Sequence, residues 1–184
     1  MITVPAGFQR SLPGWRTSPL ALWKAVLMWL LASPVVQAQA LWGGSAVGMS
    51  VEQVRQRFPE AVAPDTPDVL YSGATEALRI PGLELAGQRF QASFFFLDGR
   101  LAQVTLGLID FGSQDVAEQA FEAVSQVLRE EHGAELTRER TVGTVTKARS
   151  TWRSGRTHNV LLYMVVGRAD PLLNLVYQAL PAER

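Results

Sequence analysis

Alternating apolar and polar residues predict a β-hairpin in the middle of the chain. In residues 89–96, phenylalanine and alanine at every second position alternate mostly with polar residues, the period of a half-buried strand. Asp98 and Gly99 then favour a tight turn, and the apolar residues of 101–109 predict the returning strand.

Two other segments have helical spacing. Ser50 and Gln53 have the spacing of a capping box, which predicts a short helix that ends at Pro59. Between residues 113 and 132, apolar residues recur every three or four positions and acidic residues mostly occupy the other side. Gly133 then predicts the end of this long helix.

Four strand-like runs follow the long helix, at residues 136–142, 145–153, 157–166 and 172–180. Glycine, proline or serine lies in each connection between them, so we expect turns and an antiparallel meander. Trp152 has the opposite parity to the cations of the second run, and we therefore expect it to point into the core.

These elements predict an α+β domain, with helices packed on one face of an antiparallel sheet or sheets. Residues 41–184 are enough for a single domain with its own core. Short strands are also predicted at 69–71 and 77–80. The halves 48–110 and 111–184 would then form a degenerate tandem of a helix followed by up to four strands.

The first forty residues have the pattern of an export signal. They carry three basic residues and no acidic residue, and Lys24 precedes the apolar stretch 25–32. Small residues near Ala40 predict cleavage after that residue. The alternative is an anchor that stays in the membrane, but a span needs about 20 apolar residues. Lys24 and Pro34 bracket a shorter run, so we expect no membrane span after cleavage.

Amino-acid composition indicates a cellular compartment and excludes several kinds of functional site. The chain has no cysteine, which excludes thiol catalysis, thiolate metal sites and disulfides, and together with the leader favours a bacterial periplasm. Without the leader and its three basic residues, fourteen basic and seventeen acidic residues remain, a formal charge of −3. This balance argues against a nucleic-acid partner.

Catalytic groups are few. We expect no metal and no cofactor, because only two histidines are present and glycine-rich phosphate loops are absent. His158, with Asp170 and Ser154 in turns near the two ends of its strand, leaves a small periplasmic hydrolase as an alternative function. No nucleophile elbow surrounds the serine.

Basic residues gather in the C-terminal part of the chain. If residues 143–144 form a two-residue turn, Arg140 lies opposite Lys147 and Arg138 lies opposite Arg149, which puts four cations on one sheet face. Such a face needs compensation, either from the acidic side of the long helix and from solvent, or from a partner. The partner would be a phospholipid or lipopolysaccharide headgroup, a cell-wall carboxylate or an acidic protein surface of the envelope.

The segment 48–54, followed by Phe58 and Pro59, resembles the helix opening of small periplasmic α+β domains of the BamE (SmpA/OmlA) and β-lactamase-inhibitor type. The resemblance implies helices on one face of an antiparallel sheet and a function in binding. This chain departs from both types, because it has no cysteine for a lipid anchor or for disulfides.

From these patterns we expect an exported, non-enzymatic binding module that uses Arg138, Arg140, Lys147 and Arg149. A purely structural role in a larger envelope complex is a further alternative.

Overall fold

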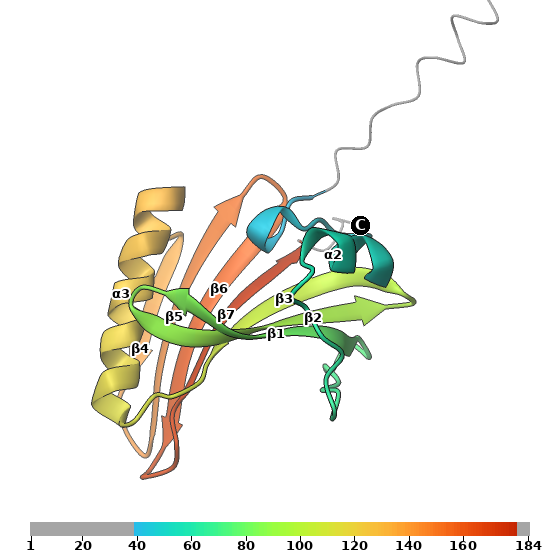
Figure 1. Ribbon diagram of the computed structural model, residues 1–184. Helices are drawn as coiled ribbons and strands as arrows, with labels where there is room; N and C mark the ends of the chain where they lie inside the picture. The colour runs from blue at the N-terminus through green and yellow to red at the C-terminus, as the bar shows by residue number, and fades with distance from the viewer. Residues whose placement is uncertain (1–38, 180–184) are drawn as a thin grey trace, which may run out of the picture. The chain divides into compact units, whose positions relative to one another are not determined.

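A seven-stranded antiparallel sheet with two helices packed against it forms the protein (Figure 1). The structure, a computed structural model, describes residues 39–179, so the predicted leader lies outside the described residues except for Gln39 and Ala40. The predicted α+β class is confirmed. Along the chain the elements are η1 (Trp42–Gly44), α2 (Val51–Arg57), β1 (Thr75–Leu85), β2 (Gln88–Leu97), β3 (Arg100–Leu108), α3 (Gln114–His132), β4 (Thr137–Thr141), β5 (Val145–Ser154), β6 (Thr157–Val166) and β7 (Leu172–Ala179).

The strand order in the sheet is β1-β2-β3-β7-β6-β5-β4. Each half of the chain starts at an edge of the sheet and steps inward, and the last strands of the two halves, β3 and β7, pair at the centre. The first half has three strands. The predicted strand at 69–71 is an isolated bridge between Val69 and Thr75, and the one at 77–80 is part of the longer β1. The tandem origin of the halves stays a prediction.

Local signals account for the ends of the elements. The capping box is confirmed, since the Ser50 hydroxyl accepts from the Gln53 amide and the Gln53 side chain accepts from the Ser50 amide. The Ser113 hydroxyl caps α3 by accepting from the Val116 amide, without a reciprocal side-chain bond, and Gly133 ends this helix at a φ of 81°. The predicted turn at Asp98 and Gly99 is confirmed, with both residues at positive φ. None of the helices within residues 39–179 is long and apolar enough to cross a bilayer.

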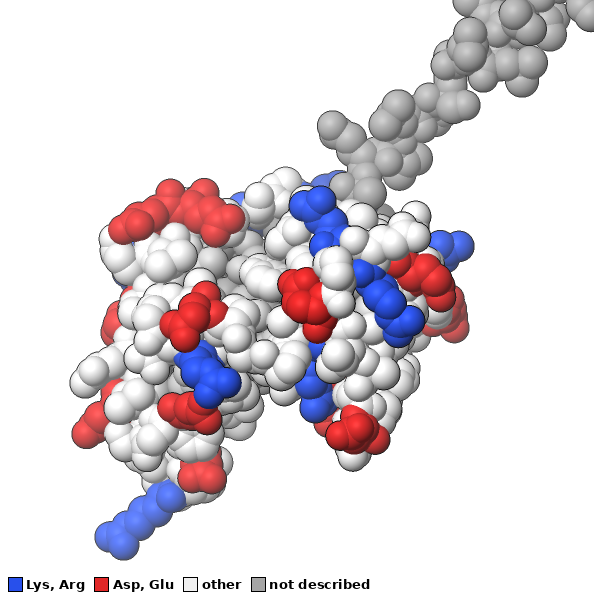
Figure 2. Space-filling model, in the orientation of Figure 1, with Lys and Arg blue, Asp and Glu red and all other residues white. Residues whose placement is uncertain are grey.

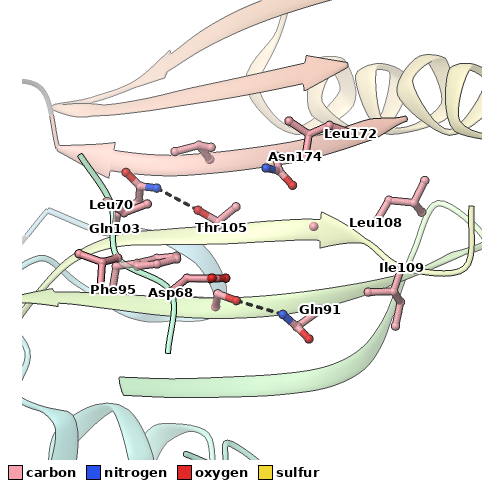
Figure 3. A pocket seen from close by; sticks show the side chains of 14 residues that line it. Asp68, Leu70, Gln91, Phe95, Gln103, Thr105, Leu108, Ile109, Leu172 and Asn174 are labelled. Carbon is pink, nitrogen blue, oxygen red and sulfur yellow. Dashed lines mark hydrogen bonds between the residues drawn. The ribbon is translucent and has the colours of Figure 1, made fainter. Parts of the chain in front are cut away.

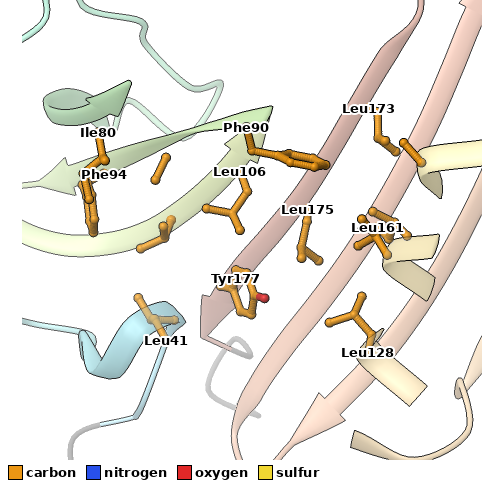
Figure 4. Close-up of a cluster of buried hydrophobic side chains, with 14 of the residues drawn as sticks. Leu41, Ile80, Phe90, Phe94, Leu106, Leu128, Leu161, Leu173, Leu175 and Tyr177 are labelled. Carbon is orange, nitrogen blue, oxygen red and sulfur yellow. The ribbon is translucent and has the colours of Figure 1, made fainter. Parts of the chain in front are cut away.

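The core lies between the helices and one face of the sheet (Figure 4). Strand residues of a single parity point into it, because successive side chains alternate between the two faces. Trp152 is buried there as predicted, and its indole N–H donates to the Gly133 carbonyl at 3.1 Å. The buried side chains that form the core between the sheet and the helices include those of Phe58, Phe90, Phe94, Leu106, Phe121, Leu128, Leu161, Tyr163 and Leu175.

Gln39 and Ala40 are part of the folded domain. The Thr157 hydroxyl donates to the Ala40 carbonyl at 2.6 Å, and the Val47 amide donates to the Gln39 carbonyl at 2.9 Å. Thr157 is only 4% exposed, so its hydroxyl depends on this acceptor. The predicted cleavage after Ala40 would remove both bonds, whereas a product that begins at Gln39 would keep them.

We predict that a chain beginning at Leu41 is less stable than one beginning at Gln39 by about 1–2 kcal/mol, because a buried hydroxyl loses its acceptor. Urea unfolding of the two chains measures the difference. In a Thr157→Val background the two chains should differ less, since the hydroxyl is absent from both. Equal stability of the two chains in the wild-type background would contradict the assignment.

Candidate functional site

The four predicted cations do not share one sheet face. In the β4–β5 pair, Arg140 lies opposite Ala148 and Arg138 lies opposite Ser150. The predicted pairing was therefore wrong by one residue, because the connection is centred on Thr144 rather than between residues 143 and 144. A shift of one residue exchanges the two faces of a strand, so Arg138 and Arg140 lie on the face opposite Lys147 and Arg149.

Arg138 and Arg140 lie on the helix side, where the acidic side of α3 compensates them. The Arg138 guanidinium donates to both carboxylate oxygens of Glu122, at 2.6 and 2.7 Å, and its Cζ lies 5.6 Å from the centre of the Phe121 ring. Arg140 pairs with Glu118. Figure 2 shows acidic side chains gathered along the α3 side of the molecule. Compensation by the long helix, one of the alternatives open from the sequence, accounts for these two arginines.

Glu135 extends this ionic cluster. A hydrogen bond from Arg129 at 2.5 Å lowers the pKa of Glu135 to about 2, and a bond from Arg138 at 3.1 Å acts in the same direction against the effect of burial. The bonds to Glu122 and Glu135 raise the pKa of Arg138. Since these bonds join β4 to α3, their role is structural.

The opposite face of the sheet is covered by no helix in the described part of the chain. Because β5, β6, β7, β3 and β2 pair without a register shift as far as Phe95, the side chains of this face line up in rows that cross from strand to strand. We call this surface the open face. One row is Arg149, Leu162, Asn174, Gly107 and Gln91, and another is Arg153, His158, Gln178, Gln103 and Phe95. The row of Thr151, Val160, Val176, Thr105 and Ser93 lies between them.

Lys147, Arg149 and Arg153 form a cationic line on the β5 side of the open face. Among residues 39–179, none of the three makes an ion pair, and Arg153 bonds only the Gly155 carbonyl, at 3.2 Å. Glu139 of β4 pairs with Arg149 in the strand register, but the two side chains do not form an ion pair. The two sides of the sheet therefore differ: the β4 arginines on the helix side form ion pairs, and the β5 cations form none within residues 39–179.

The open face also carries a hollow of about 570 Å³, which lies away from β5, over β2, β3 and β7 (Figure 3). Gly107 leaves its floor without a side chain, and segment 68–70 forms one wall. The Gln103 amide donates to the Thr105 hydroxyl at 2.9 Å, and the Gln91 amide donates to the Ser93 hydroxyl at 3.3 Å. No local sequence pattern predicts this hollow, because it forms only where the β2–β3 hairpin meets β7 and the loop at 68–70, which are distant from it in the chain.

A buried ion pair holds the wall of the hollow in place. Glu76 is only 1% exposed and accepts two bonds from Arg79, at 2.8 and 2.5 Å, and one from the Asp68 amide at 3.3 Å. Burial alone raises the pKa of Glu76, but the bonds from Arg79, Ser93 and Asp68 outweigh it and the net pKa is lowered. The charged carboxylate thus fixes segment 68–70 against β1.

The predicted hydrolase residues do not come together. His158 begins β6, and Asp170 follows its far end, beyond about 26 Å of extended strand. Ser154 has the parity of the core face, opposite to that of His158. Burial lowers the pKa of His158, and Arg149 and Arg153 lower it further. Within residues 39–179, no group of three His, Asp or Glu side chains is placed to hold a metal ion.

Comparisons of the chain with protein-family models, with curated proteins and with solved structures found no match. The resemblance of residues 48–59 to BamE-type and inhibitor-type domains therefore stays an expectation from the sequence.

We predict that Arg138→Gln lowers the free energy of unfolding by about 1 kcal/mol or more, because Glu122 and Glu135 lose their bonds. Lys147→Gln, which removes the same charge from the open face, should change it by less than about 0.5 kcal/mol. Urea unfolding near neutral pH compares the two variants. The opposite order would show that the β5 cations, rather than the β4 arginines, are structural.

Proposed function

We propose that this protein is a non-enzymatic binding module that holds an acidic partner protein on the open face of its sheet. The observation that carries the proposal is the charge difference between the two faces. Arg138 and Arg140 are paired with acids inside the protein, whereas Lys147, Arg149 and Arg153 make no ion pair among residues 39–179, even though Glu139 lies opposite Arg149. Unneutralised cations on a surface that no helix covers attract an acidic surface of another molecule.

The spacing of the three cations favours a protein over a lipid headgroup. Lys147, Arg149 and Arg153 have the same parity on one strand, so they stand side by side and do not converge. Neighbouring positions on one strand face are about 6.6 Å apart, which puts Arg149 and Arg153 about 13 Å apart. One phosphate group cannot contact all three, but carboxylates spread over a protein surface can.

The residues beside the cations are also those of a protein interface. Val160, Leu162 and Met164 of β6 and Val176 of β7 lie next to them on the open face and are only partly covered or shallowly buried. Apolar residues at the centre with charged residues at the rim are the usual arrangement of an interface. Seven strands are about 29 Å across, wide enough for a standard interface of about 800 Å² per partner.

The leader pattern adds the compartment to this proposal. If residues 1–40 direct export, the domain meets its partner in the periplasm, where a fold without cysteine depends on its core alone. The partner is then an envelope protein.

Site-specific photo-crosslinking in cells tests the proposal on the full chain. A photoreactive residue at Met164, on the open face, should give a defined protein adduct, and the same residue at the exposed Gln119 of α3 should not. Lys147→Gln with Arg149→Gln should lower the Met164 adduct by roughly fivefold or more, because the attraction is lost.

The matched control removes two cations from other surfaces, by Arg55→Gln with Arg168→Gln, and should leave the adduct unchanged. Equal adducts from Met164 and Gln119, or equal losses in the two double variants, would overturn the proposal. Binding of the wild-type chain to phosphatidylglycerol vesicles that is lost in the Lys147/Arg149 variant would replace the partner protein by a lipid headgroup.

His158 should report the presence of carboxylates on the cationic line. In the free protein its pKa is lowered by burial and by Arg149 and Arg153. An acidic ligand neutralises these arginines, so the bound protein should have a higher His158 pKa and bind the ligand more tightly as the pH falls through the range in which His158 becomes protonated.

NMR titration of the His158 ring with and without a decaglutamate peptide measures this change. The pKa should rise with the peptide and stay constant with a decaglutamine peptide. Arg149→Gln should raise the pKa without any peptide, and Arg55→Gln should not. A His158 pKa that falls when the acidic peptide binds would place the peptide away from the cationic line.

A further inference from the structure

The hollow on the open face has a chemistry of its own. Among residues 39–179, Asp68 is the only acidic residue that lines it, and no lysine, arginine or histidine of this part of the chain does so. Gln91 and Gln103 each use one of their two amide N–H groups, on Ser93 and Thr105, and their carbonyl oxygens remain as acceptors. Asn174 adds another amide. The lining therefore offers amide oxygens together with one carboxylate, and the carboxylate favours a ligand that donates hydrogen bonds and carries a positive charge.

The nearby cations do not cancel this preference. Arg79 is close to Asp68, but its guanidinium is bonded twice to the buried Glu76. The cationic line on β5 is separated from β3 by β7 and β6, a distance of about 14 Å across the sheet. A positive group at Asp68 is thus beyond a Debye length at physiological ionic strength from the cationic line.

Aliphatic side chains complete the hollow. Leu70, Leu108, Ile109 and Leu172 lie around its rim and walls, and Figure 3 shows them around the amide groups of β2, β3 and β7. A ligand that fits both parts has an apolar stem and a donor head. In proteins, lysine and arginine side chains have this form, since they bury the stem and keep the charged head among polar groups.

We propose that the hollow binds the end of a lysine or arginine side chain, which anchors the partner on the open face. This inference rests on the proposed function, because it gives the acidic partner one basic anchor at the hollow while its acidic groups face Lys147 and Arg149. The two ends of the open face then recognise opposite charges, which defines the orientation of the partner.

A small probe tests the hollow without the partner. The full chain is titrated with n-butylguanidinium, and the amide signals of Gly107, Gln91 and Gln103 are followed by NMR. We expect saturable shifts confined to the hollow, weaker binding of the neutral butyramide, and none of the anionic butyrate. Absence of saturable shifts with the cation, or binding of butyrate as tight as that of the cation, would overturn the inference.

Two acidic residues of the same loop supply a matched pair of variants. Asp68→Asn should weaken n-butylguanidinium binding by about tenfold, since a charge-assisted bond is lost. Asp65→Asn removes the same charge from a residue that does not line the hollow and should have little effect. Equal weakening in both variants would show that the loop acts only by its general charge, and would overturn the assignment to Asp68.

Gly107→Leu fills the hollow from its floor. The first added carbon lies 3.1 Å from the Asn174 side-chain oxygen, the end of a side chain that can turn away. Binding of n-butylguanidinium should be lost while the far-UV circular dichroism stays that of the wild type. If only this probe experiment fails, the hollow is not an anchor site and the cationic line keeps its role. If only the Met164 crosslink fails, the hollow binds a free cation and no partner covers the open face.

Discussion

The two-residue alternation of side chains along paired strands is the constraint on which this structure depends. Because the seven strands stay largely in register, every position belongs to a row that crosses the sheet, and each row lies wholly on one face. One set of rows packs against α2 and α3 and forms the core. The other set becomes the open face, with cations at the β5 side and an acceptor-lined hollow over β2, β3 and β7.

The arginines of β4 and β5 show that the face on which a charged side chain lies decides its role. Arg138 lies over Phe121 and bonds Glu122 and Glu135, so its charge joins β4 to α3. Arg149, one strand away and on the other face, lies opposite Glu139 but forms no ion pair with it or with another acid among the described residues. Identical side chains thus hold the fold together on one face and remain available to a partner on the other.

The buried pair of Glu76 and Arg79 has a similar double effect. It fixes segment 68–70 against β1 and by doing so builds a wall of the hollow and places Asp68 beside it. A carboxylate buried for a structural reason therefore shapes the surface that we propose as an anchor site. The stability of this wall is lost as the pH falls, since the lowered pKa of Glu76 stabilises the fold only while the group is charged.

Local periodicity, caps and turn residues act over a few positions, so the sequence by itself determined the features that depend on them. These are the α+β class, the helix at Ser50, the long helix after Ser113, the hairpin at Asp98 and Gly99, and the inward direction of Trp152. The faces of Arg138, Arg140, Lys147 and Arg149 were decided by the pairing of β4 with β5. The centre of one turn set that register, and a shift of one residue exchanged the faces. The hollow arises only where the β2–β3 hairpin meets β7 and the loop at Asp68, and contacts of the hairpin with segments so distant along the chain have no local signal.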